Sequence, residues 1–176
     1  IQCCLVGSEM CIRDSNWIYN FSLPPLLIHA FLFENSSYLN KWSKKLPNAK
    51  FQNSYLNFIA SHDGIGLRPA ETFLTKDEVT RFINLMEQNG GRVSYRSNNT
   101  DTPEPYEINI TLFDAMRESF NKEVSLYVER FICIHAIMLS LEGVPAFYIH
   151  SLFGTQNDYA LYEKTNQNRS LNRGKI

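Results

Sequence analysis

Residues 57–66 read NFIASHDGIG, an apolar run that ends in a histidine and an aspartate and continues into two closely spaced glycines. A short apolar run bounded by glycine is typical of a strand buried on both faces, so we predict a strand from Tyr55 to Ser61. His62 and Asp63 then lie at its carboxyl end, where α/β folds bind their ligands. The glycines allow a sharp turn or a close backbone approach. A polar strand end with a turn explains this stretch equally well, and both interpretations stay open here.

The composition is that of a globular protein: 176 residues, 44% hydrophobic, 13% aromatic, with a formal net charge of −1. It excludes a disordered or collagen-like chain. The near-zero charge gives no argument for a nucleic acid or an anionic membrane as partner. The apolar segment Leu23–Phe33 is far shorter than the about 20 residues of a membrane span and contains His29. We therefore expect neither a nucleic-acid partner nor a membrane partner.

The four cysteines are unevenly distributed, because three lie in the first fifteen residues and only Cys133 lies elsewhere. Residues 4–15, CLVGSEMCIRDS, resemble the translation of a transposase sequencing adapter. We interpret residues 1–15 as an adapter-like, non-native segment and leave them out of fold and function. The alternative, a genuine leader, lacks the basic start and longer apolar centre of a signal peptide. The remaining cysteine suits a reducing cytoplasm, and we expect it to pack in the core.

The chain after this segment alternates between strand and helix patterns. We predict a strand over residues 16–21, a helix over 24–33 that opens at two prolines, and a helical turn near Trp42. Thr75 and the acidic residues after it predict a helix that ends at Gln88, before two glycines.

The second half of the chain continues this alternation. Residues 92–106 are polar and contain prolines, which predicts a long loop. A helix over 122–141, a buried strand over 144–149 and a polar tail from residue 153 without a closing element follow. Strands that alternate with helices indicate parallel strands joined by crossover helices, and thus an α/β fold. Three strands leave both edges of a sheet open, so we expect the chain to be part of a larger fold.

Four segments carry a family resemblance: NFIASHDGIGLRPAE (57–71), GGRVSYRSNNTDTPEPYEIN (90–109), GVPAFYIHSLFGTQND (143–158) and NQNRSLNR (166–173). In this order and spacing they resemble the later part of sucrose-phosphorylase-type enzymes of glycoside hydrolase family 13, in the α-amylase superfamily. The branch that contains glucosylglycerate phosphorylase is the most similar. The resemblance covers residues 16–176 and implies a partial (β/α)8 TIM barrel, approximately strands 6 to 8, with an insert after strand 7 and truncation at both ends.

The same resemblance assigns roles to individual residues. Asp63 is the carboxylate that stabilises the oxocarbenium-like transition state without bonding to the anomeric carbon, and His62 would hydrogen-bond a hydroxyl of the same glucose. Arg169 matches an arginine of the glucose subsite, with a surface role as its alternative. Tyr106 and Glu107 match the acceptor-site loop. Where this loop often has glutamine the chain has Glu107, and a carboxylate there would repel phosphate unless it is turned away or paired.

The implied function is that of a retaining glycoside phosphorylase, which transfers a glucosyl group between an α-glucoside and phosphate to give α-glucose 1-phosphate. The glucoside would be glucosylglycerate or sucrose-like, phosphate would be a co-substrate, no metal or organic cofactor is implied, and the enzyme would be cytoplasmic. The family's nucleophile and acid/base lie on earlier strands, so we expect this chain alone to be inactive. A hydrolase or transglycosidase of the same family and a non-catalytic amylase-like binding protein stay open as alternatives.

Five further polar residues have weaker patterns. Arg92 or Arg96 could bind an acidic aglycone such as glycerate, against the more common alternative of a surface role. His29 and His135 lie among apolar helix residues and predict core histidines. His150 follows the last predicted strand, and a role beside the site and a purely structural role are equally open for it.

Overall fold

The computed structural model describes residues 16–49, 53–96, 103–122 and 125–175. The adapter-like segment, with its three cysteines, lies outside the described residues, and so does part of the loop predicted over 92–106. Within the described residues no helix is both long and apolar enough to cross a membrane.

The first sheet is parallel and has the strand order β1-β2-β6. Its strands are β1 (Trp17–Tyr19), β2 (Ser54–Asn57) and β6 (Val144–Pro145), with Ile18 opposite Tyr55 and Leu56 opposite Val144. This parallel pairing confirms the predicted α/β class. The strands are shorter than predicted, but pairing extends one residue farther at β6, where the amide of Ala146 donates to the carbonyl of Asn57 at 2.7 Å.

The edge strand β6 corrects the prediction of a buried strand over 144–149. Only two residues have strand geometry, and the chain then enters α7 (Ile149–Leu152). Val144, Phe147 and Ile149 are exposed in this structure, since β6 is the outer strand of the sheet and has a neighbour on one side only.

The second sheet is antiparallel, with the order β3-β5-β4, and consists of β3 (Ile65–Gly66), β4 (Arg92–Arg96) and β5 (Glu104–Asn109). The prediction of a loop over 92–106 is therefore wrong for residues 92–96 and 104–106, while residues 97–102 lie outside the described residues. Val93 lies opposite Ile108, and both side chains are buried, as are the polar neighbours of Ile108 on β5, Glu107 and Asn109. Pro105 fits because the register shifts there, opposite Tyr95, where a missing N–H is tolerated.

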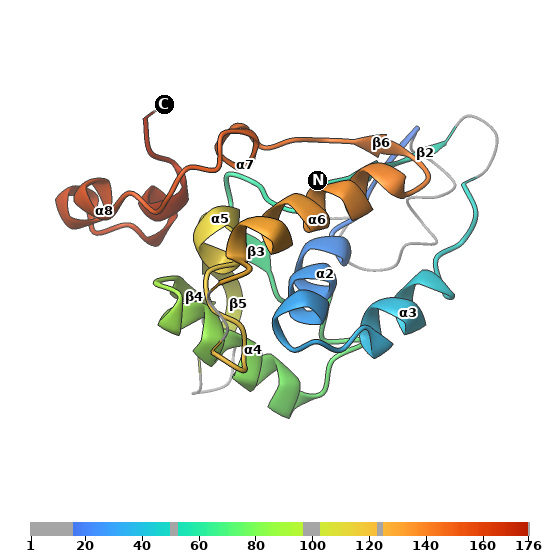
Figure 1. The fold of residues 1–176 in the computed structure, drawn as a ribbon, viewed down its shortest axis with the longest axis horizontal. Helices are drawn as coiled ribbons and strands as arrows, with labels where there is room; N and C mark the ends of the chain where they lie inside the picture. Colours follow the sequence, from blue (N-terminus) through green and yellow to red (C-terminus); the bar gives the residue numbers. More distant parts are fainter. Residues whose placement is uncertain (1–15, 50–52, 97–102, 123–124, 176) are drawn as a thin grey trace.

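The helices of the first half of the chain contribute much of the core, and Figure 1 shows α2 (Leu23–Leu32) in the middle of the molecule. Helix α2 is buried along most of its length, as its nearly continuous apolar sequence predicts. It is followed by the predicted helical turn, α3 (Ser37–Ser43). Helix α4 (Lys76–Gln88) begins where it was predicted, since the Thr75 hydroxyl accepts a hydrogen bond from the amide of Glu78. His29 confirms the core prediction: it is buried and donates from Nε2 to Glu78 at 2.9 Å.

Helix α6 (Tyr127–Ser140) connects the antiparallel sheet to β6. It begins later than predicted and buries Ile134 and Met138 toward the core. Cys133 is exposed, contrary to the predicted core packing, because it lies next to Ile134 on the helix and thus points away from the buried stripe. His135 is half-buried and donates from Nδ1 to the carbonyl of Phe131 at 2.7 Å.

The C-terminal segment is structured, so the prediction of a tail without a closing element is wrong. It forms α8 (Tyr159–Thr165) and a 3₁₀ helix, η2 (Asn168–Asn172). Asp158 caps α8 by accepting from the amide of Leu161 at 2.8 Å. A short helix after β5, α5 (Leu112–Ala115), is linked to this segment because the amide of Asn157 donates to Asp114 at 2.7 Å. The antiparallel sheet, α5 and the C-terminal segment thus form one connected unit.

Candidate active site

The turn after β2 fixes the position of Asp63. Gly64 has φ +105°, and a Cβ at this position would lie 2.5 Å from the Ile108 carbonyl oxygen of β5. Glycine is therefore required where the two sheets approach each other. The Asp63 carbonyl accepts a 2.8 Å hydrogen bond from the side chain of Asn109, at the end of β5. The backbone of the turn is thus held from the antiparallel sheet.

Two arginines from η2 and its C-cap bind the Asp63 carboxylate. Arg169 Nη1 lies 3.0 Å from Asp63 Oδ1, and Arg173 Nη2 lies 3.1 Å from the same oxygen. Arg173 also donates from Nε to the carbonyl of His62 at 2.7 Å. Between them Asn172 donates to the carbonyls of Ser61 and His62, each at 3.1 Å. The sequence NRSLNR therefore holds both the carboxylate and the backbone that carries it.

Glu107 is the second carboxylate at this position, and it is paired. Its two oxygens accept from Arg169 Nε at 3.0 Å and Nη2 at 2.8 Å, a bidentate geometry that is stronger than a single contact. The side chain of Glu107 is only 7% exposed, and Oε1 also accepts from Asn109 Nδ2 at 2.7 Å. These hydrogen bonds raise the pKa of Arg169 above its ordinary value, so its guanidinium stays charged. A single arginine thus bridges the two carboxylates, Asp63 and Glu107.

The polar side chains around this bridge are connected across four elements. Ser94 on β4 donates to the side-chain oxygen of Asn109 at 2.8 Å. Asn168, at the start of η2, donates to the Val93 carbonyl at 3.1 Å and to the Ser94 hydroxyl at 3.2 Å. Because β4, β5, η2 and the turn after β2 are joined in this way, the positions of the charged groups are fixed in advance of any ligand.

His62 lies beside Asp63 but is far more accessible. Its Nε2 atom is 3.5 Å from Asp63 Oδ1, and its side chain is 68% exposed, against 48% for Asp63. The position of His62 comes from its backbone, which the side chains of Asn172 and Arg173 hold. Its ring is available to a ligand that reaches Asp63.

Asp63 lies where two hollows meet. The larger, of about 610 Å³, also contains Tyr106, Glu107, Arg68 and Arg96 on its wall. The smaller, of about 300 Å³, contains His62 and the residues after β6. Both volumes fall in the range of about 300–1,000 Å³ that is usual for small-molecule sites. Three aromatic rings are shared by the two hollows and contact one another: Tyr19, Phe21 and Phe58.

The structure thus brings together all five site residues predicted from the sequence: His62, Asp63, Tyr106, Glu107 and Arg169. Sequence reasoning did not single out Arg173, Asn172 or Asn109. A signal existed for Arg173, since it follows Arg169 at a spacing of four and both arginines come after an asparagine. No sequence signal exists for Asn109, whose role depends on the β3-β5 pairing.

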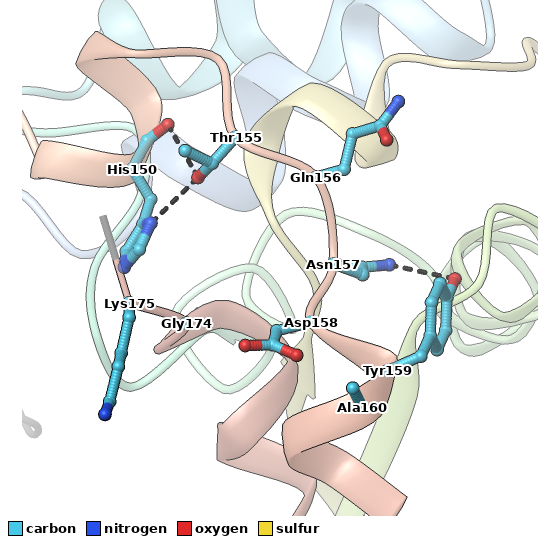
Figure 2. A pocket seen from close by; sticks show the side chains of 9 residues that line it. All are labelled: His150, Thr155, Gln156, Asn157, Asp158, Tyr159, Ala160, Gly174 and Lys175. Atoms are coloured by element: carbon cyan, nitrogen blue, oxygen red, sulfur yellow. Dashed lines mark hydrogen bonds between the residues drawn. The ribbon is translucent and has the colours of Figure 1, made fainter.

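Of the residues with weaker patterns, Arg92 and His150 lie apart from this cluster, whereas Arg96 does not. Arg92 donates to the carbonyl of Gly91 and lies over the ring of Tyr162, while Arg96 reaches the larger hollow. Figure 2 shows His150 in a separate hollow, where its Nδ1 is 2.8 Å from the Thr155 hydroxyl. His150 is buried against Tyr148 and has a structural partner of its own. Within the described residues no group of three or more metal-ligating side chains occurs.

No family model matches the chain. Among curated proteins it is 43% identical over 164 residues to a glucosylglycerate phosphorylase of Escherichia coli, and 39% identical over 164 residues to a glucosylglycerate phosphorylase of Allomeiothermus silvanus. A sucrose phosphorylase of Streptococcus mutans is 26% identical over 159 residues. These matches cover 92%, 93% and 89% of this chain. The chain is a homologue of the glucosylglycerate and sucrose phosphorylases.

The chain spans only part of these relatives: 29% of the length of each of the two glucosylglycerate phosphorylases and 30% of the length of the sucrose phosphorylase. A crystal structure of sucrose 6F-phosphate phosphorylase from Thermoanaerobacter thermosaccharolyticum is similar in fold, with a TM-score of 0.80 at 20% sequence identity. The match covers 96% of the present chain and 32% of the chain in that crystal structure. At this identity the likeness shows the fold alone. The fold is therefore similar to that of about a third of this phosphorylase structure, which together with the parallel sheet confirms the predicted α/β class.

Proposed function

We propose that this chain is part of a retaining glycoside phosphorylase, which transfers a glucosyl group reversibly between an α-glucoside and phosphate to give α-glucose 1-phosphate. One observation carries the proposal: Asp63, on a chain 43% identical to a glucosylglycerate phosphorylase, is held between two arginines at the point where two hollows meet. A fixed carboxylate at a strand end is suited to grip sugar hydroxyls as the ring flattens toward the transition state. Glucosylglycerate is the glucoside favoured by the relatives' names, with a sucrose-like substrate second.

In this proposal Asp63 stabilises the oxocarbenium-like state and His62 binds a hydroxyl of the same glucose. Arg169 and Arg173 hold the Asp63 carboxylate in place, so that little reorganisation is needed when positive charge develops on the sugar. The nucleophile and the acid/base belong to earlier strands of the complete barrel, and this chain without them has no catalysis. No metal or organic cofactor takes part, and inorganic phosphate is the co-substrate.

Glu107 belongs to the acceptor half of the site together with Tyr106. A free carboxylate there would oppose the entry of phosphate, but the bidentate pair with Arg169 neutralises it. The pairing removes the electrostatic objection to a phosphorylase that the sequence raised. In this proposal phosphate occupies the acceptor half of the site when the glucoside is cleaved, and the hydroxyl acceptor occupies the same half when the glucoside is formed.

The sheet order supports the proposed position of these strands in the barrel. In a (β/α)8 barrel neighbouring strands are consecutive, and β1, β2 and β6 occur in the order β1-β2-β6. We assign them to strands 6, 7 and 8, with the antiparallel sheet and α5 as the insert after strand 7. We further propose that residues 1–15 are not native to the protein and that residues 16–176 are the barrel portion. Cytoplasmic location fits the free, exposed Cys133, and a nucleic-acid or membrane partner has no part in this function.

The first experiment is to read the source DNA across the Ser15–Asn16 junction from a library prepared without transposase adapters. A reading frame that continues upstream through five further strand–helix units, with an aspartate and a glutamate at strand ends, supports the proposal. If CLVGSEMCIRDS is encoded at this junction, the assignment of residues 1–15 as non-native is wrong.

The second experiment assays the full-length protein on glucosylglycerate and on sucrose with and without inorganic phosphate. A phosphorylase releases α-glucose 1-phosphate only when phosphate is present. Release of free glucose at the same rate without phosphate would establish the hydrolase alternative, and no turnover with either substrate would favour a binding protein.

A further inference from the structure

We propose that Arg68, assisted by Arg96, is the anion-binding element of the acceptor half of the larger hollow. The inference rests on the proposed function and names residues for a part of the substrate that Asp63, His62 and Arg169 do not recognise. Both arginines are on the wall of the 610 Å³ hollow, together with Tyr106 and Asp63. Neither is on the wall of the smaller hollow, which contains His62. The two hollows therefore differ in charge as well as in size.

The charged side chains around the larger hollow include one more guanidinium group than carboxylate groups. Among the described residues, four guanidinium groups lie on or next to the larger hollow: Arg68, Arg96, Arg169 and Arg173. Three carboxylates face them: Asp63 binds Arg169 and Arg173, Glu107 binds Arg169, and Glu104 lies 3.6 Å from Arg96. The excess of one positive charge makes an anionic ligand favourable on this side.

Arg68 carries that excess. Its side chain is exposed, and within the described part of the chain no hydrogen bond or ion pair involves its guanidinium. Its backbone is nevertheless fixed, because the Arg68 carbonyl accepts from the amide of Glu71 at 3.2 Å and the neighbouring Leu67 donates to the Tyr106 carbonyl at 3.0 Å. A guanidinium whose donors have no partner among the described residues, on a fixed backbone beside a hollow, is suited to bind a carboxylate or phosphate bidentately.

Arg96 is the weaker partner of the two. Its contact with Glu104 is long and exposed, and such pairs contribute little to stability. A ligand carboxylate can therefore replace Glu104 at small cost. Arg92, on the same strand, is engaged with Gly91 and Tyr162 outside the hollow and provides a matched control.

The shared chemistry is an anion beside the acceptor hydroxyl, and it has two sources: the carboxylate of an acidic acceptor such as glycerate, or the attacking phosphate. The test compares glycerate with glycerol, its neutral counterpart, as acceptors of glucose from α-glucose 1-phosphate in the full-length protein. The variants are Arg68→Gln, Arg68→Lys, Arg96→Gln and the control Arg92→Gln. The KM for phosphate is measured in the opposite direction.

With a carboxylate as the anion, Arg68→Gln lowers kcat/KM for glycerate by about tenfold to a hundredfold, the loss of one charge-assisted hydrogen-bonded pair, and leaves glycerol unchanged. Arg68→Lys retains part of the preference, Arg96→Gln has a smaller effect, and Arg92→Gln has none. A rise in the KM for phosphate with an unchanged glycerate-to-glycerol ratio identifies phosphate as the anion instead.

The inference is wrong if Arg68→Gln changes neither quantity, or if Arg92→Gln changes them as much. Failure of the proposed function is separate, because then the wild-type protein forms no glucose 1-phosphate. In that case calorimetric titration of the wild type and of Arg68→Gln with glycerate and with inorganic phosphate still tests whether Arg68 binds an anion. Binding of either anion that is lost in Arg68→Gln supports the anion site, and equal binding or no binding overturns it.

Discussion

The two sheets contribute to the candidate site in different ways. The parallel sheet carries the candidate carboxylate, since Asp63 follows β2, and the arginines that bind this carboxylate, Arg169 and Arg173, come from η2 and its C-cap. The antiparallel sheet supplies the groups that hold it: Asn109 binds the Asp63 backbone, and Glu107 orients the arginine that binds the Asp63 side chain. In this molecule the sheet that carries the candidate functional group and the sheet that positions it are therefore separate.

The largest effect is expected when the negative charge of Asp63, which follows a strand of the parallel sheet, is removed. In the full-length protein, Asp63→Asn keeps the shape of the side chain and should lower kcat by about a hundredfold or more, because stabilisation of developing positive charge is lost. The fold should persist, since Arg169 keeps its bidentate partner Glu107 and Arg173 is partly exposed. Steady-state kinetics and a thermal melt of the same sample check both statements. Near-normal kcat would exclude the role given to Asp63.

The next effect concerns the point of contact between the sheets. Gly64→Ala should destabilise the protein by about 1–3 kcal/mol, because it combines a strained positive φ with a Cβ only 2.5 Å from the Ile108 carbonyl oxygen. Gly66→Ala is the matched control, since the nearest atom to its Cβ, on Pro69, lies 3.9 Å away. Denaturant unfolding of the two variants measures the difference. Equal denaturation midpoints for the two variants would mean that the turn at Gly64 and β5 do not approach each other this closely.

A smaller effect tests the positioning role of the antiparallel sheet. Arg169→Lys keeps the charge, but a lysine cannot bind Glu107 through two parallel hydrogen bonds and reach Asp63 as well. We expect kcat to fall by about tenfold, less than for Asp63→Asn, with a small change in KM. Arg173→Lys serves for comparison, because Asn172 still holds the His62 backbone in that variant. A larger loss in Arg173→Lys would reverse the order of importance of the two arginines.

The sheets also differ in how far the sequence predicted them. The parallel strands and their helices follow from apolar runs, prolines and the Thr75 cap, which are local signals. The antiparallel sheet was missed because its pairing joins residues whose local sequence is polar and contains proline, and only the cross-strand match of Val93 with Ile108 reveals it. Long-range pairing of this kind has no counterpart in a window of neighbouring residues.

The same reasoning separates the site residues. Motifs in the sequence pointed to Asp63, His62 and Arg169. For Glu107 the sequence required that its carboxylate be paired or turned away from phosphate, and in the structure it is paired with Arg169. Asn109 contacts Asp63 only because β3, β5 and the turn lie together, so its role could not follow from its own sequence position.

The smallest effect lies at the open edge of the parallel sheet and depends on pH. The His135 ring stacks on Phe147, just after β6, with 5.5 Å between the ring centroids. Burial lowers the His135 pKa below its ordinary value of 6.5, and the hydrogen bond to Phe131 partly offsets this shift. The unfolded chain therefore binds this proton more readily than the folded chain. The contribution of His135 to stability is present above the unfolded value and is lost as the pH falls below about 6.5.

Protonation would also place a charge on His135 Nε2, which is buried and has no hydrogen-bond partner among the described residues. We expect backbone amides around β6 to exchange faster at mildly acidic pH while those of β5 change less, as measured by hydrogen exchange. His135→Phe keeps a ring against Phe147 and cannot ionise, so it should remove this difference between the sheets. His29, whose pKa burial also lowers, lies between α2 and α4 and would make both sheets respond together. A uniform response that persists in His135→Phe would therefore assign the pH dependence to His29 rather than to the sheet edge.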